Sequence, residues 1–178
     1  MPMIGFSDGK DITESAPLED FLLFFETLRG LHEKGYKQYP FAKTIGKGEF
    51  PLMMSKLFRG FVPFDEIDTL ENEVINAKNA FSMIPSSFLK RPSLSSDSQI
   101  NLSKQSLSGV FERMFDGIEH SIEGSREYNN LGHPALPVKI IVSEIPSALT
   151  MLRMSEEDYN QKNKPPIWTY YGNRVIPR

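Results

Sequence analysis

Residues 48–81 read GEFPLMMSKLFRGFVPFDEIDTLENEVINAKNAF and carry the clearest structural pattern of the chain. The first part of this stretch is apolar and ends at the break Gly60-Phe61-Val62-Pro63. Beyond the break, apolar residues recur at the spacing of one buried helix face. These residues are Ile67, Leu70, Val74, Ala77 and Phe81. The stretch therefore predicts a helix that begins near residues 63–65 and packs its apolar face against a core.

The first turns of this predicted helix are acidic. They carry five carboxylates with no Lys or Arg among them: Asp65, Glu66, Asp68, Glu71 and Glu73. Carboxylates near a helix N-terminus interact favourably with the helix dipole, which gives the acids a purely structural reason. Runs of charge are also usually solvated faces. Five acids without a basic residue exceed what the dipole explains, so they are candidates for contact with a basic partner.

The sequence on either side of this stretch predicts further elements. Residues 3–6 form a short strand followed by an Asp8-Gly9 turn. A helix with a wide apolar face then begins at Ser15 as its N-cap and ends at Gly35. After a polar surface loop at 92–106, a third helix runs from Leu107 and ends at Gly124. The C-terminal part predicts a central strand at 137–143, a short helix at 156–161 and a hairpin at 167–176.

Composition limits the class of protein. The length of 178 residues favours one domain, and 39% hydrophobic with 24% charged residues is ordinary for a globular protein. Because helix and strand patterns are mixed along the chain, we predict a single α+β domain over 1–178. We expect an antiparallel or mixed sheet of four to six strands packed against two or three helices. The chain has no cysteine, which excludes disulfides and thiol nucleophiles. A net charge of −3 argues against general nucleic-acid affinity. The sequence shows neither a signal peptide nor a bilayer-length apolar run, so we expect a cytoplasmic protein and no membrane partner.

Candidate catalytic chemistry is sparse. Asp116 and His120 lie four residues apart on the third predicted helix and could share a metal or a proton. Two ligands specify little, so we predict no catalytic residues, no metal and no cofactor. Two alternatives stay open. One is a small enzyme that uses carboxylates and His120, and the other is a single-stranded nucleic-acid-binding module that uses Trp168, Tyr170 and Tyr171.

Four segments together resemble a known family. They are residues 49–54, 57–63, 68–81 and 84–87. In these segments the chain is similar to the bacterial immunity protein 70 family, which is found in polymorphic-toxin and contact-dependent growth inhibition loci. The order of the other predicted elements also fits, whereas residues 88–94 depart from the tryptophan- and aspartate-containing segment of the family.

The resemblance implies an inhibitor rather than an enzyme. Such a protein forms a heterodimer with the C-terminal domain of its cognate toxin, often a nuclease with a basic cleft, and blocks the active site. An acidic surface would speed this association. The expected contacts are Asp65, Glu66, Asp68, Glu71 and Glu73, with Phe61 or Phe64 as an apolar anchor. Strand addition at the C-terminal hairpin is a second route.

Overall fold

The computed structural model describes residues 3–10, 12–42, 51–89, 100, 102–143, 157 and 160. It contains a four-stranded antiparallel sheet with the strand order β2-β1-β4-β3. The strands are β1 (Met3–Ser7), β2 (Ile12–Pro17), β3 (Phe61–Val62) and β4 (Val138–Ser143). The predicted α+β class is therefore confirmed. β4 lies between β1 and β3, as the apolar sequence of residues 137–143 predicted.

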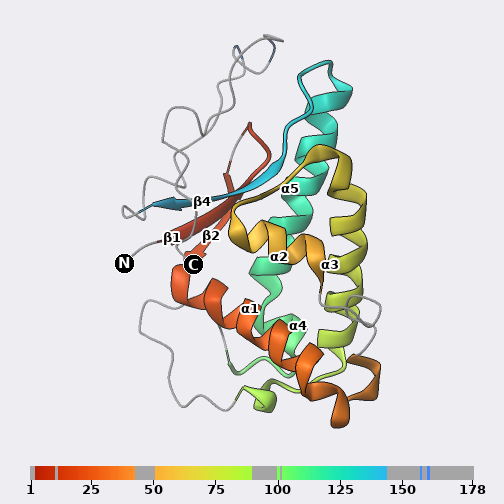
Figure 1. Cartoon of the computed structure of the whole chain (residues 1–178). Coiled ribbons are helices and arrows are strands. Elements are labelled where there is room, and N and C mark those ends of the chain that lie inside the picture. The colour runs from red at the N-terminus through yellow and green to blue at the C-terminus, as the bar shows by residue number, and fades with distance from the viewer. Residues whose placement is uncertain are drawn as a thin grey trace.

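The helices gather on one side of the strands (Figure 1). They are α1 (Leu18–Glu33), α2 (Leu52–Arg59), α3 (Ile67–Ser82), α4 (Leu107–Val110) and α5 (Glu112–Asn130). Three of them, α1, α3 and α5, are long. α5 packs against β1 and β2, whereas α2 packs against β3 and β4. α3 contacts both α2 and α5, so the predicted amphipathic helix lies between two other helices.

An aromatic cluster fills the space where α1, α3 and α5 meet. It contains Phe24 from α1, Phe81 from α3, and Phe111 and Phe115 at the start of α5, all almost fully buried. Phe24 lies 5.3 Å from both Phe111 and Phe115, and Phe81 lies 5.4 Å from Phe115, between ring centroids. Edge-to-face pairs of this kind add roughly 0.5–1.5 kcal/mol each to the burial of their apolar area. The predicted apolar stripes thus converge on one core.

The prediction for the first helix was wrong at its N-terminus. α1 begins at Leu18, because residues 12–17 form β2 and pair with β1, with Ile4 opposite Ala16. Ser15 therefore lies in a strand and is not the N-cap. Cross-strand hydrogen bonds to β1 supply the partners that a helical start would have needed.

The prediction that Gly124 ends the third helix was also wrong. α5 continues through this glycine to Asn130. A Cβ atom built at Gly124 would lie only 1.8 Å from Oδ2 of Asp8. Glycine is needed here because the turn between β1 and β2 places the carboxylate of Asp8 directly on the helix backbone.

Several predicted elements fall on residues that the structure does not describe. The hairpin at 167–176 lies outside the described residues, and so do most of the short helix at 156–161 and most of the loop at 92–106. Within the part of the chain that the structure describes, no helix is both long enough and apolar enough to cross a bilayer.

Candidate functional site

The connection from α2 to α3 exposes a short edge of the sheet. α2 ends at Arg59, and its C-cap Gly60 has a φ of 146°, which suits a residue without a Cβ atom. The carbonyl of Gly60 then accepts a hydrogen bond of 2.8 Å from the amide of Ile140 in β4. This contact fixes the two-residue strand β3 at the end of the described sheet. The residues that follow, Phe64 to Glu66, form one 3-10 turn that leads into α3.

This connection forms a shallow depression of about 400 Å³. It is lined by Phe61, Pro63, Phe64, Asp65, Ala135 and Pro137. The last two belong to the loop before β4, which lies beside β3 because Val62 pairs with Val138. Phe61 is 51% exposed, which is unusual for so large an apolar side chain. Three of the seven residues that the sequence predicted for partner contact, Phe61, Phe64 and Asp65, therefore surround one depression.

The acidic residues near the depression differ in their partners. Glu66 accepts hydrogen bonds of 2.7 and 2.6 Å from Nζ of Lys56 on α2. Asp65 is exposed, and within the described residues it makes no ion pair. Asp65 is consequently the carboxylate of this segment that can accept a new donor without losing an old one.

Asp68 and Glu71 share one cation, Arg126 of α5. The guanidinium donates bonds of 3.0 and 2.7 Å to the two carboxylate oxygens of Glu71, and a further bond to Asp68. The hydrogen bonds from Arg126 lower the pKa of Glu71, and those same bonds raise the pKa of Arg126. α3 itself supplies no cation here, so the compensating charge comes from a residue far along the chain.

The charges of this region leave it acidic. Four carboxylates lie here, Asp65, Glu66, Asp68 and Glu71, and two of the nearby cations, Lys56 and Arg126, pair with them. Lys139 lies opposite Phe61 in β4 as a third cation, so four negative and three positive charges leave a formal net charge of −1. Ion pairs that are this exposed contribute only about 0–1 kcal/mol to stability. Their main effect is to hold the carboxylates in defined positions.

Glu73 does not belong to this surface, contrary to the sequence-based expectation. It is only 9% exposed and accepts hydrogen bonds from the amides of Met53 (3.1 Å) and Met54 (2.8 Å). These are the first amides of α2, which have no partner within that helix. Burial raises the pKa of Glu73, and the amide hydrogen bonds oppose that shift. Its role in this structure is to cap α2 from α3.

In the structure, Asp116 of the candidate pair Asp116 and His120 lies near a lysine of α3. Asp116 lies 3.9 Å from Nζ of Lys78 on α3, and Glu119 lies 3.0 Å from the same atom. His120 is exposed. No cluster of three or more His, Asp or Glu side chains that could hold a metal occurs in the described part of the chain.

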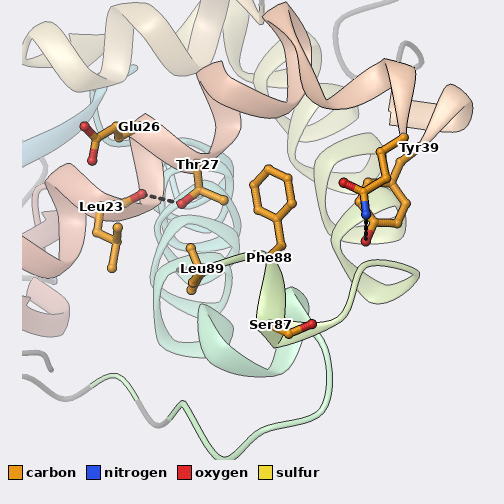
Figure 2. A pocket seen from close by; sticks show the side chains of 8 residues that line it. Leu23, Glu26, Thr27, Tyr39, Ser87, Phe88 and Leu89 are labelled. Carbon is orange, nitrogen blue, oxygen red and sulfur yellow. Dashed lines mark hydrogen bonds between the residues drawn. The ribbon is translucent and has the colours of Figure 1, made fainter. Parts of the chain in front are cut away.

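A second pocket, of about 490 Å³, lies beside α1 (Figure 2). Figure 2 shows Phe88 and Leu89 facing α1, where the hydroxyl of Thr27 donates a 2.7 Å hydrogen bond to the carbonyl of Leu23. The amide of Gln38 donates to the hydroxyl of Tyr39 at 3.3 Å. Thr27 and Gln38 are thus bonded to near neighbours in the sequence. Periodicity could not reveal this pocket, since its walls come from three distant segments.

Comparisons of the chain with known protein families, with curated proteins and with solved structures found no match. The resemblance of residues 49–87 to immunity proteins therefore stays a hypothesis about function.

Proposed function

We propose that the protein is a bacterial immunity protein, which binds one cognate toxin domain in the cytoplasm and blocks it without catalysis. The observation that supports this proposal is the grouping of Phe61, Phe64 and Asp65 around one depression at the edge of the sheet. Asp68, in the first turn of α3, adds a carboxylate whose side chain is 88% exposed. The proposal also rests on the resemblance of residues 49–87 to an immunity-protein family.

The physical properties of this surface suit a basic protein partner. Exposed aromatic residues next to charged groups are typical of the residues that dominate binding energy at interfaces. The net negative charge would attract a nuclease domain whose cleft binds phosphates, and would raise the rate of association. A depression of about 400 Å³ can accept one large side chain of such a partner.

Co-expression tests the proposal directly. The chain is expressed in bacteria together with the C-terminal toxin domain of the secreted protein encoded beside its gene. We expect restored growth and a one-to-one complex on size-exclusion chromatography. Folded chain that gives neither rescue nor complex would overturn the proposal.

Two matched double variants test whether this surface makes the contact. Phe61→Thr with Asp65→Asn removes the aromatic ring and the charge at the depression, and threonine keeps the strand preference of position 61. Leu131→Thr with Glu123→Gln removes an equally exposed apolar side chain (51%) and an exposed carboxylate from α5 and its end. We expect only the first variant to lose rescue. Equal effects of the two variants would assign toxin binding to another surface.

A further inference from the structure

The depression beside β3 combines apolar walls with one carboxylate at its rim. The rings of Phe61 and Phe64, together with Pro63 and Pro137, form the walls, and Asp65 supplies the charge. We propose that this depression is the seat of a single arginine side chain of the protein partner. The inference rests on the proposed function, which it makes more specific by naming the chemistry of the anchor residue.

The walls fit the long side chain of arginine. A guanidinium group stacks on aromatic faces and is more weakly hydrated than an ammonium group, so it is more easily moved from water to a half-buried site. Its aliphatic stem can lie against Pro63 and Pro137, as stems of charged residues do on apolar surfaces. Phe61 is 51% exposed in the unbound chain, so its ring is available for this contact.

Asp65 selects for positive charge at the rim. Glu66 is bonded to Lys56, and Asp68 and Glu71 are bonded to Arg126. Asp65 has no such bond among the described residues, and can therefore form a two-pronged pair with a guanidinium at no cost in existing contacts. An apolar side chain in the depression would instead remove water from this carboxylate without replacing its hydrogen bonds, which is unfavourable.

Lys139 does not occupy this seat. It lies opposite Phe61 in the pairing of β3 with β4. The depression is lined by Ala135 and Pro137 from that part of the chain, and Lys139 is not among its lining residues. Within the described structure, Asp65 is therefore the charged group that lines the depression.

The first experiment uses small probes and needs no toxin. The protein is titrated with N-acetyl-arginine methylamide, with its neutral citrulline analogue and with the norleucine analogue, and chemical shifts are followed by NMR. We expect saturable shifts at Phe61, Phe64 and Asp65 with the arginine probe, and about fivefold weaker binding of citrulline, since an exposed ion pair contributes up to about 1 kcal/mol. Asp65→Asn should abolish the difference. Equal binding of the citrulline or norleucine probe, or no shifts at these residues, would contradict the proposal that the depression binds an arginine side chain.

The second experiment uses the toxin complex. Asp65→Asn should weaken the complex about tenfold, mainly through faster dissociation, while Glu123→Gln on α5 should change affinity less than about twofold. Changing the arginines of the toxin to glutamine one at a time should reveal one whose loss matters with the wild-type chain but hardly with Asp65→Asn.

The outcomes separate the two proposals. If no toxin domain binds, the proposed function is wrong, and the probe titration alone decides whether the depression accepts arginine. If the complex forms and neither Asp65→Asn nor Phe61→Thr weakens it, the arginine seat is wrong and the proposed function stands.

Discussion

The inner side of α3 and its N-terminal end use the same type of side chain in opposite ways. Glu73 faces inward, is 9% exposed and holds two amides of α2. Asp65 precedes the helix, faces solvent at the rim of an apolar depression and makes no ion pair within the described residues. A run of acids is therefore not one functional unit. What each carboxylate does depends on which donors the rest of the fold brings to it.

The sharpest contrast between these regions is in stability. Phe81→Ala removes a fully buried ring from the cluster with Phe24, Phe111 and Phe115. We expect the free energy of unfolding to fall by about 3–5 kcal/mol, because a cavity remains. Phe61→Thr at the exposed edge should change it by less than about 0.5 kcal/mol. Urea unfolding measures both variants, and similar losses would show that Phe61 belongs to the core.

Glu73→Met should have the next largest effect. Methionine keeps roughly the volume of the side chain but leaves the amides of Met53 and Met54 without their acceptor. We expect a loss of about 1–3 kcal/mol in the free energy of unfolding. The control is Glu123→Met on the exposed side of α5, for which a change within about 0.5 kcal/mol is expected. A neutral Glu73→Met variant would contradict the capping role.

Arg126→Gln removes the cation that pairs with Asp68 and Glu71 and should lower the free energy of unfolding by a smaller amount. The side chain of Arg126 is 32% exposed and that of Asp68 is 88% exposed, so solvent screens their interaction. We expect a loss of only about 0.2–1 kcal/mol in thermal or urea unfolding. Lys104→Gln, which breaks the exposed pair with Glu112 at 3.4 Å, is the matched control. A loss as large as that of Glu73→Met would mean that Arg126 is structural in the same sense as Glu73.

The smallest effect is a difference in pH dependence between two carboxylates of α3. The pKa of Glu73 is raised above 4.5 by burial, so its contribution to stability is present below pH 4.5 and is lost as the pH rises through the raised pKa. The pKa of Glu71 is lowered from 4.5 by hydrogen bonds from Arg126, so its contribution is present above pH 4.5 and is lost as the pH falls through the lowered pKa.

Unfolding of Glu73→Gln and Glu71→Gln at several pH values measures this difference. On acidification, the stability advantage of the wild-type chain over Glu73→Gln should grow toward pH 4.5. Its advantage over Glu71→Gln should shrink below pH 4.5. Parallel curves for the two variants would contradict the contrast between the inner and outer carboxylates.

Local patterns predicted the long elements of this fold well. The apolar stripes of α3 and α5 and the β-branched run of β4 are properties of neighbouring residues, so sequence carries them. β2 was missed because residues 12–17 become a strand only by pairing with β1. The sequence pattern gave the wrong helix end at Gly124, because this glycine makes room for Asp8, a residue far away in the sequence.

The candidate surface was predictable only in part. The grouping of Phe61, Phe64 and Asp65 could be predicted because these residues are close in sequence. The contribution of Ala135 and Pro137 to the same depression could not be predicted, because they are distant in sequence. A signal for Glu73 existed: it follows Leu70 by three residues and precedes Ala77 by four, which places it beside the buried stripe. No local signal indicated Arg126, because its partners lie 55 and 58 residues earlier.

The cap that Glu73 provides has a consequence for synthesis of the chain. α2 has eight residues, too few for a stable helix by itself, and the carboxylate that accepts its first amides is translated about twenty residues later. We therefore expect α2 to remain unfolded on the ribosome until α3 has emerged, and the two helices to form together.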